Sequence, residues 1–144
     1  MASLKGDTRF GVMQQAFYHF STSSGSPLYL HMKTNIPKSS NIMFYIEAEG
    51  YNYGTTYAVS CGWTGYAYAG DGNLYSVHTY NFYSGMNADG VYLSSDNYVV
   101  IRGYAASHYF NGFVLNSVMA NPNGNNYRVS ISAAVQTSTS GNYY

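Results

Sequence analysis

Two carboxylates stand at positions where they could act together. Glu47 and Glu49 are two residues apart in a segment of alternating polarity, so on a β-strand their side chains would share one face, roughly 7 Å apart along the backbone. Carboxylate pairs near that distance hydrolyse glycosidic bonds, and with further oxygen ligands they bind Ca²⁺. The simpler expectation is a solvent-facing strand. A further alternative is that Glu47 pairs with Arg102 or Arg128 across a subunit boundary.

A second group of residues has the chemistry of carbohydrate recognition. Tyr51 and Tyr53 flank Asn52 in a glycine-bounded loop, and a glycine-rich segment with several aromatic residues follows. Aromatic faces pack on sugar rings, while neighbouring amide or carboxylate groups bond sugar hydroxyls. We therefore predict a glycan-binding set that consists of Tyr51, Asn52, Tyr53, Trp63, Tyr66, Tyr68, Asp71 and Asn73. The alternative is that these rings pack in the core and between subunits, and Trp63, the only tryptophan, is the one most expected to be buried.

The histidines and the Gly70–Asn73 segment give no comparable signal. His19, His31, His78 and His108 lack the close spacing typical of zinc ligands, although a single histidine near a three-fold axis would be presented three times. The Gly70–Asn73 segment lacks the regular acidic positions of a calcium loop and is interpreted as a turn. We expect no metal site and no cofactor.

An enzymatic function is also disfavoured. The sequence contains no nucleophile–histidine–acid spacing, phosphate-binding loop or nucleotide fingerprint. We therefore predict that the protein is not an enzyme and has no catalytic residues. A polysaccharide-degrading enzyme that combines Glu47 or Glu49 with Asp71 or Asp96 is the less favoured alternative.

Composition excludes several classes of partner. Only 12 of the 144 residues are charged, 6 basic and 6 acidic, and 8% is far below the roughly 25% of an ordinary soluble domain. Without a basic stripe or a lysine- and arginine-rich cluster we expect neither nucleic-acid binding nor membrane-surface binding. No apolar run has the length of a signal peptide or a membrane span, so we expect no membrane insertion and a protein that is either intracellular or assembled inside a cell and released by lysis. A neutral surface rich in tyrosine favours association with other subunits.

The elements that must position these residues are predicted to be strands. The 18 tyrosines favour β-structure, and the 15 glycines favour turns. Cys61 is the only cysteine, so no disulfide forms within the chain, and we expect it to be a small buried residue. Alternating or apolar runs between turn signals predict strands over 14–22, 28–33, 42–49, 55–69 (one strand, or two broken at Gly62 or Gly65), 74–83, 91–93, 98–104, 113–119 and 127–135.

This spacing predicts one all-β domain. We expect an antiparallel β-sandwich, jelly-roll-like, with about eight strands. In this interpretation residues 1–13 form an N-terminal arm or linker, residues 14–135 form the sandwich, and residues 136–144 form a polar, frayed C-terminal tail.

Three segments resemble a known class of proteins. They read KTNIPKSSNIMFYIEAEGYNYG from Lys33, SSDNYVVIRGY from Ser94 and FVLNSVMANPNGNNYRVSIS from Phe113. Together they are similar to C-terminal segments of bacteriophage tail-fibre and virion-appendage proteins, over roughly residues 28–135. The resemblance implies a homotrimer located in the virion, with other virion proteins as partners and a receptor-binding head. It assigns no functional residue.

The combined prediction is a viral structural protein. We expect a tail-fibre or virion-appendage head that mediates host-surface attachment through a host glycan, as a homotrimer. The alternative is a purely structural role in capsid decoration or as a tail adaptor.

Overall fold

The protein is described here by a computed structural model that covers residues 10–19, 27–107, 109–120, 136–138 and 141–144. Within these residues the regular structure is entirely β, with no helix. The strands are β1 (Phe10–His19), β2 (Leu28–Pro37), β3 (Ile42–Asn52), β4 (Tyr57–Ala67), β5 (Leu74–Ser84), β6 (Asn87–Leu93), β7 (Tyr98–Ala105), β8 (Asn111–Ala120) and β9 (Gln136–Ser138). In the part of the chain described, no helix suitable for crossing a membrane is found.

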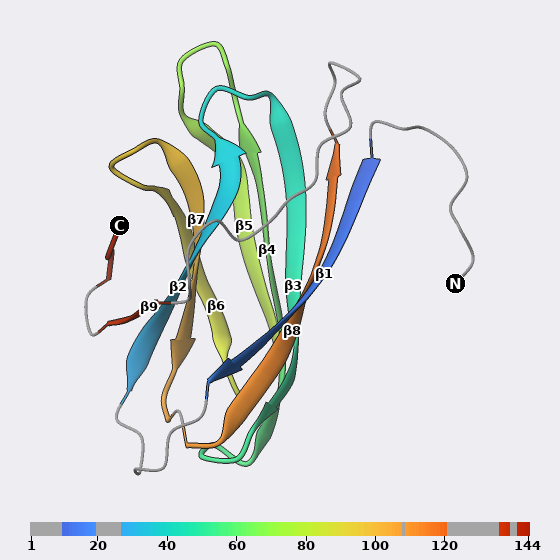
Figure 1. The fold of residues 1–144 in the computed structure, drawn as a ribbon, viewed down its shortest axis with the longest axis vertical. Coiled ribbons are helices and arrows are strands. Elements are labelled where there is room, and N and C mark those ends of the chain that lie inside the picture. The colour runs from blue at the N-terminus through green and yellow to red at the C-terminus, as the bar shows by residue number, and fades with distance from the viewer. Residues whose placement is uncertain (1–9, 20–26, 108, 121–135, 139–140) are drawn as a thin grey trace.

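The strands form two antiparallel sheets that pack face to face (Figure 1). The five-stranded sheet has the order β1-β8-β3-β4-β5, and the four-stranded sheet has the order β6-β7-β2-β9. The predicted antiparallel β-sandwich is therefore confirmed. In the five-stranded sheet, β3, β4 and β5 follow one another as hairpins, and β8 returns from the other sheet to lie beside β3. That order is a Greek key, the connection from which jelly rolls are built.

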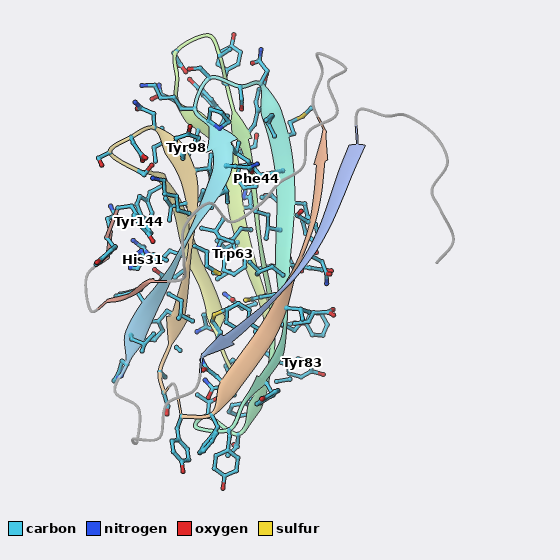
Figure 2. The ribbon with its side chains drawn as sticks, viewed as in Figure 1. His31, Phe44, Trp63, Tyr83, Tyr98 and Tyr144 are labelled. Carbon is cyan, nitrogen blue, oxygen red and sulfur yellow. The ribbon has the colours of Figure 1, made fainter. Side chains whose placement is uncertain are left out.

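Alternation along the strands explains why the two sheets pack. On β3, Ile42, Phe44, Ile46 and Ala48 are buried, while the residues between them are exposed or half-buried. A strand with a period of two presents one apolar face, and this face must be covered by a second sheet. Figure 2 shows the side chain of Phe44 between the two sheets. The opposing layer comes from apolar residues of β2 and β7, such as Leu30, Met32, Val99 and Ile101.

The predicted strand from 55 to 69 is one strand, not two. β4 runs through Gly62 and Gly65 without a break. At Gly65 an added Cβ would lie 2.6 Å from the Phe44 ring, and at Gly62 it would lie 2.3 Å from the Tyr80 ring. The two glycines therefore admit aromatic rings onto the strand on opposite faces, and neither ends it.

The ends of the domain differ from the predicted boundaries. β1 begins at Phe10, inside the segment interpreted as an arm, and β9 lies in the segment interpreted as a frayed tail. Beyond β9 the tail contacts the four-stranded sheet: the backbone nitrogens of Tyr143 and Tyr144 each donate to Tyr92 Oη at 3.2 Å. Arg102 donates to Asn142 Oδ1 at 2.7 Å. The predicted strand at 127–135 lies outside the described residues.

Candidate functional site

An open pocket of about 450 Å³ lies at the hairpin turn that joins β3 to β4. It is lined by Tyr51, Asn52, Tyr53, Thr56, Tyr57 and Ala58. Tyr51, Tyr53 and Tyr57 are 50%, 66% and 56% exposed. Three exposed phenol rings around one pocket offer both apolar faces and hydroxyl groups, which is the chemistry that a sugar ring requires.

Asn52 fixes the shape of this pocket from below. Its side chain is buried, and its Nδ2 donates to the backbone oxygens of Gly85, at 2.7 Å, and Ser107, at 2.6 Å. Its Oδ1 accepts a hydrogen bond from Gly54 N at 3.0 Å. These three bonds join three loops through Asn52. Because they use both amide hydrogens, Asn52 has no donor left for a ligand. The predicted contact between Asn52 and a glycan is therefore corrected to a positioning role.

Tyr109 and Phe110, just before β8, support the same hairpin. Tyr53 N donates to Phe110 O at 3.0 Å, and Gly54 N donates to Tyr109 O at 2.8 Å. Thr56 and Phe110 both adopt left-handed backbone conformations, with φ of 61° and 47°. Such conformations are uncommon in residues other than glycine and persist only where the surroundings fix them; they also occur away from the pocket, at Ser39, Asn41, Ser76 and Asn97. The pocket is thus built on two turns that hold each other.

The structure divides the predicted glycan-binding set between two ends of the sandwich. Tyr51 and Tyr53 lie at the β3–β4 turn, whereas Tyr68, Asp71 and Asn73 lie around the β4–β5 turn. Strand β4 separates the two turns by roughly 33 Å, since it has eleven residues. Figure 1 shows these two turns at opposite ends of the molecule. They do not form one site.

The β4–β5 end carries an aromatic cluster of its own. The ring centroids of Tyr66 and Tyr68 are 5.7 Å apart, as are those of Tyr68 and Tyr75. Asp71 accepts hydrogen bonds from Tyr75 Oη and, at 3.0 Å, from Asn73 N. The bond from Tyr75 contributes most to holding the pKa of Asp71 below its usual value. The bond from Asn73 N also closes the turn that the sequence predicted at Gly70–Asn73.

Trp63 is removed from the predicted glycan-binding set, and its expected burial is confirmed. It is 0% exposed, and its Nε1 donates to Arg102 O at 2.9 Å. It lies on the inner face of β4, so its N–H reaches the backbone of β7 in the opposite sheet (Figure 2). Tyr66 is half-buried on the other face of β4, where its hydroxyl donates to Asn41 Oδ1 at 3.1 Å.

The carboxylates considered for catalysis are not assembled around one cleft. Glu47 and Glu49 share the outer face of β3, as expected. Glu47 accepts hydrogen bonds from Tyr45 and Tyr80, and within the chain Arg102 is bonded to Asp89 at 2.7 Å. Asp96 forms an ion pair with Lys33, which lies on a strand of the other sheet. Among the described residues no group of three or more His, Cys, Asp or Glu is placed to hold a metal ion.

The only cysteine and the histidines that the structure describes also lie in surroundings typical of structural residues. Cys61 is buried, and burial raises the pKa of its thiol to about 12, so it is not a ready nucleophile. His31 is buried with its Nδ1 3.0 Å from Tyr92 Oη. His78 is exposed on β5. The side chains of His19 and His108 are outside the part of the chain that the structure describes.

The sequence interpretation missed three residues that line the pocket, Thr56, Tyr57 and Ala58. All three were assigned to a strand beginning at residue 55, so they were not grouped with Tyr51 and Tyr53. A hairpin over these residues would have indicated the grouping. Across its turn, Asn52 pairs with Tyr57 and Tyr51 pairs with Ala58. In a tight hairpin, the residues that leave the turn stand beside those that enter it.

Comparison of the chain with protein-family models, with curated proteins and with solved structures gave no match.

Proposed function

We propose that the protein is a surface-attachment module of a bacteriophage virion appendage, and that it binds a host-surface carbohydrate at the β3–β4 pocket. The observation that carries the binding role is the pocket itself, which places Tyr51, Tyr53 and Tyr57 around an opening at one end of the sandwich. The viral setting rests on the resemblance of roughly residues 28–135 to tail-fibre and appendage proteins. Attachment by repeated weak contacts suits shallow aromatic pockets, because several linked copies multiply a modest affinity.

The pocket is tested by removing its rings one at a time. Tyr53→Ala and Tyr57→Ala are expected to weaken binding of a glycan, identified on an array, by about tenfold each, which corresponds to about 1.4 kcal/mol. The reason is that each variant removes one apolar face and one hydroxyl from the pocket wall without touching the core. Titration calorimetry with the soluble glycan measures the change.

Tyr143→Ala is the matched control for these two variants. Tyr143 is 53% exposed, like the pocket tyrosines, and it lies against Tyr92 of the other sheet. It should bind the glycan as the unmodified protein does. If all three variants bind with unchanged affinity, or if no glycan on the array is bound, the pocket is not a carbohydrate site.

The proposal includes assembly of the protein into a homotrimer. Other virion proteins would then contact this trimer. Because the chain has no net charge, electrostatic repulsion between subunits is weak. Light scattering after size exclusion is expected to give the mass of three subunits. A mass of one subunit at micromolar concentration would contradict the trimer and the avidity that depends on it.

A purely structural role, as a capsid decoration or tail adaptor, is the second candidate. Phe82 on β5 is 76% exposed, and it has no polar group to bond a sugar. An exposed apolar ring on an edge strand is better suited to cover by a protein partner. This role predicts binding to another virion protein with no glycan bound at any concentration.

A further inference from the structure

The outer face of β3, β4 and β5 carries aromatic side chains along its whole length. The strand registers align the outward residues of these three strands into successive rows, spaced roughly 7 Å apart along the strands. From the pocket toward the opposite end, the rows are Tyr51–Ala58, Glu49–Ser60–Tyr83, Glu47–Gly62–Tyr80, Tyr45–Thr64–His78 and Met43–Tyr66–Tyr75. Every row contains at least one tyrosine. Hence an aromatic surface continues from the pocket to the cluster at the β4–β5 turn.

Two β-bulges in β5 bring its tyrosines to this face. The register of β5 against β4 shifts between Ser60 and Cys61 and again between Thr64 and Tyr66. A strict period of two counted from Tyr80 would place Phe82 and Ser76 in line with it. The bulges place Tyr83 and Tyr75 there instead, opposite Ser60 and Tyr66. Bulges re-aim side chains in this way, often beside functional sites.

A hydrogen-bonded group spans the third and fourth rows, formed by Tyr45, Glu47 and Tyr80. Tyr45 Oη donates to Glu47 Oε2 at 2.7 Å and lies 2.6 Å from Tyr80 Oη, which is 3.3 Å from the same carboxylate oxygen. The two rings are within 8° of parallel. Burial, with the bonds to each other and to Glu47, raises the pKa of Tyr45. Both phenols direct their single hydrogen at Glu47, so toward a ligand their oxygens act as acceptors.

Gly62 makes this arrangement possible. An added Cβ at Gly62 would lie 2.3 Å from Tyr80 Cε1 and 2.9 Å from its hydroxyl oxygen. The phenol end of Tyr80 consequently rests on the strand backbone and remains 37% exposed on its other side. A side chain at position 62 would lift Tyr80 away from Tyr45 and Glu47.

The charges on this face restrict the class of ligand that it can bind. Glu47 and Glu49 are the charged residues of the strands in the five-stranded sheet, and no lysine or arginine occurs in those strands. An anionic polymer would be repelled by the two carboxylates. A second copy of the same face would bring four carboxylates together without a counter-charge, which is costly because they would lose their hydration. A neutral ligand rich in hydroxyl groups supplies donors to both carboxylates at no such cost.

We propose that this face is a binding track for an extended, neutral polysaccharide chain that enters at the Tyr51–Tyr53–Tyr57 pocket and runs along β3, β4 and β5. The track rests on the proposed carbohydrate-binding function and identifies its ligand class. The rows from Tyr51 to Met43 span roughly 27 Å, so a chain of several sugar units lies along them. Tyr83, Tyr80 and Tyr45 provide stacking faces and hydroxyls, and Glu47 and Glu49 accept the sugar hydroxyls.

The test compares ligand lengths on the whole 144-residue protein. Neutral cello-, laminari-, manno- and galacto-oligosaccharides, each as a disaccharide and a hexasaccharide, are titrated calorimetrically, with polygalacturonate and polysialic acid as anionic probes. A neutral hexasaccharide is expected to bind at least about tenfold more tightly than its disaccharide, because it contacts several rows at once. Tyr80→Ala and Gly62→Ala should each remove most of that gain. Tyr53→Ala should weaken both lengths, and Tyr143→Ala neither.

Each result separates the track from the pocket. Equal affinity for disaccharide and hexasaccharide, or no effect of Tyr80→Ala on the hexasaccharide, overturns the track and leaves the pocket intact. Tighter binding of an anionic polymer overturns the neutral ligand class. A change in oligomeric mass with Tyr80→Ala would show that a second copy covers this face, which also overturns the track. If no oligosaccharide of either length binds, the proposed carbohydrate function fails together with the track.

Discussion

Trp63→Ala is expected to lower the free energy of unfolding by about 3–5 kcal/mol, the range for deleting a fully buried large aromatic side chain. The indole is 0% exposed and lies in the cluster of apolar residues shared by the two sheets. Its removal leaves a cavity that closes only partly, because the surrounding side chains and strands are already close-packed. The loss is a large part of the stability of a domain of this size. Urea denaturation followed by far-UV circular dichroism measures it.

Trp63→Phe separates the hydrogen bond from the packing. Phenylalanine keeps much of the apolar volume but removes the N–H that donates to Arg102 O. The expected loss is about 1–3 kcal/mol, because a buried carbonyl is left without its donor, in addition to a smaller packing term. A loss below about 1 kcal/mol for Trp63→Ala would contradict the placement of Trp63 at the centre of the core.

The core strands were predictable because their residues alternate. Ile42, Phe44, Ile46 and Ala48 repeat with a period of two, and the structure buries all four on one face of β3. That pattern depends only on local geometry, so it survives without knowledge of the partner sheet. Pairing of β9 with β2 depends on tertiary contact instead, and the three residues of β9, Gln136–Ser138, are all polar. No periodicity marks such a strand.

The structure brings only part of the predicted glycan-binding set together, and the reason lies in strand β4, which runs between its members. Tyr51 and Tyr53 lie in the pocket, but Trp63 and Tyr66 are three residues apart on β4 and therefore face opposite sides of the sheet. This placement on opposite faces was predictable from the sequence. The burial of Asn52 was not, because its partners, Gly85 and Ser107, come from loops that only the folded sandwich brings together.

The aromatic track could not have been found by counting along β5. Tyr75, His78, Tyr80 and Tyr83 are spaced by three, two and three residues, which fits no regular strand. They share a face because the two bulges each insert one residue, and the register against β4 reveals this. Functional surfaces are where such departures from local regularity are expected.

Asn52→Ala is expected to destabilise the protein by about 3 kcal/mol and to abolish the pocket, since it leaves buried backbone groups without partners at about 1–3 kcal/mol each. The carbonyls of Gly85 and Ser107 lose their donor, and Gly54 N loses one of its two acceptors. The rings of Tyr51, Tyr53 and Tyr57 remain present, but the turn that holds them is no longer fixed. Denaturation and calorimetric titration with the array-identified glycan measure the two effects. Asn73→Ala, an exposed asparagine in the opposite turn, should change stability by less than about 0.5 kcal/mol.

Asn52→Asp tests this explanation through the pH dependence of the stability of the variant. The substitution keeps one acceptor for Gly54 N but directs a carboxylate oxygen at two carbonyl oxygens that had received hydrogen bonds. Burial and these carbonyls disfavour the charged form, so the pKa of the new carboxyl in the folded state should rise above its unfolded value of about 3.9. Stability of the variant relative to the unmodified protein should therefore be greatest at low pH, where the carboxyl is protonated and donates again, and should fall as pH rises through the folded-state pKa. A variant equally stable relative to the unmodified protein at pH 4 and pH 8 would mean that the Asn52 amide does not hold the three loops together.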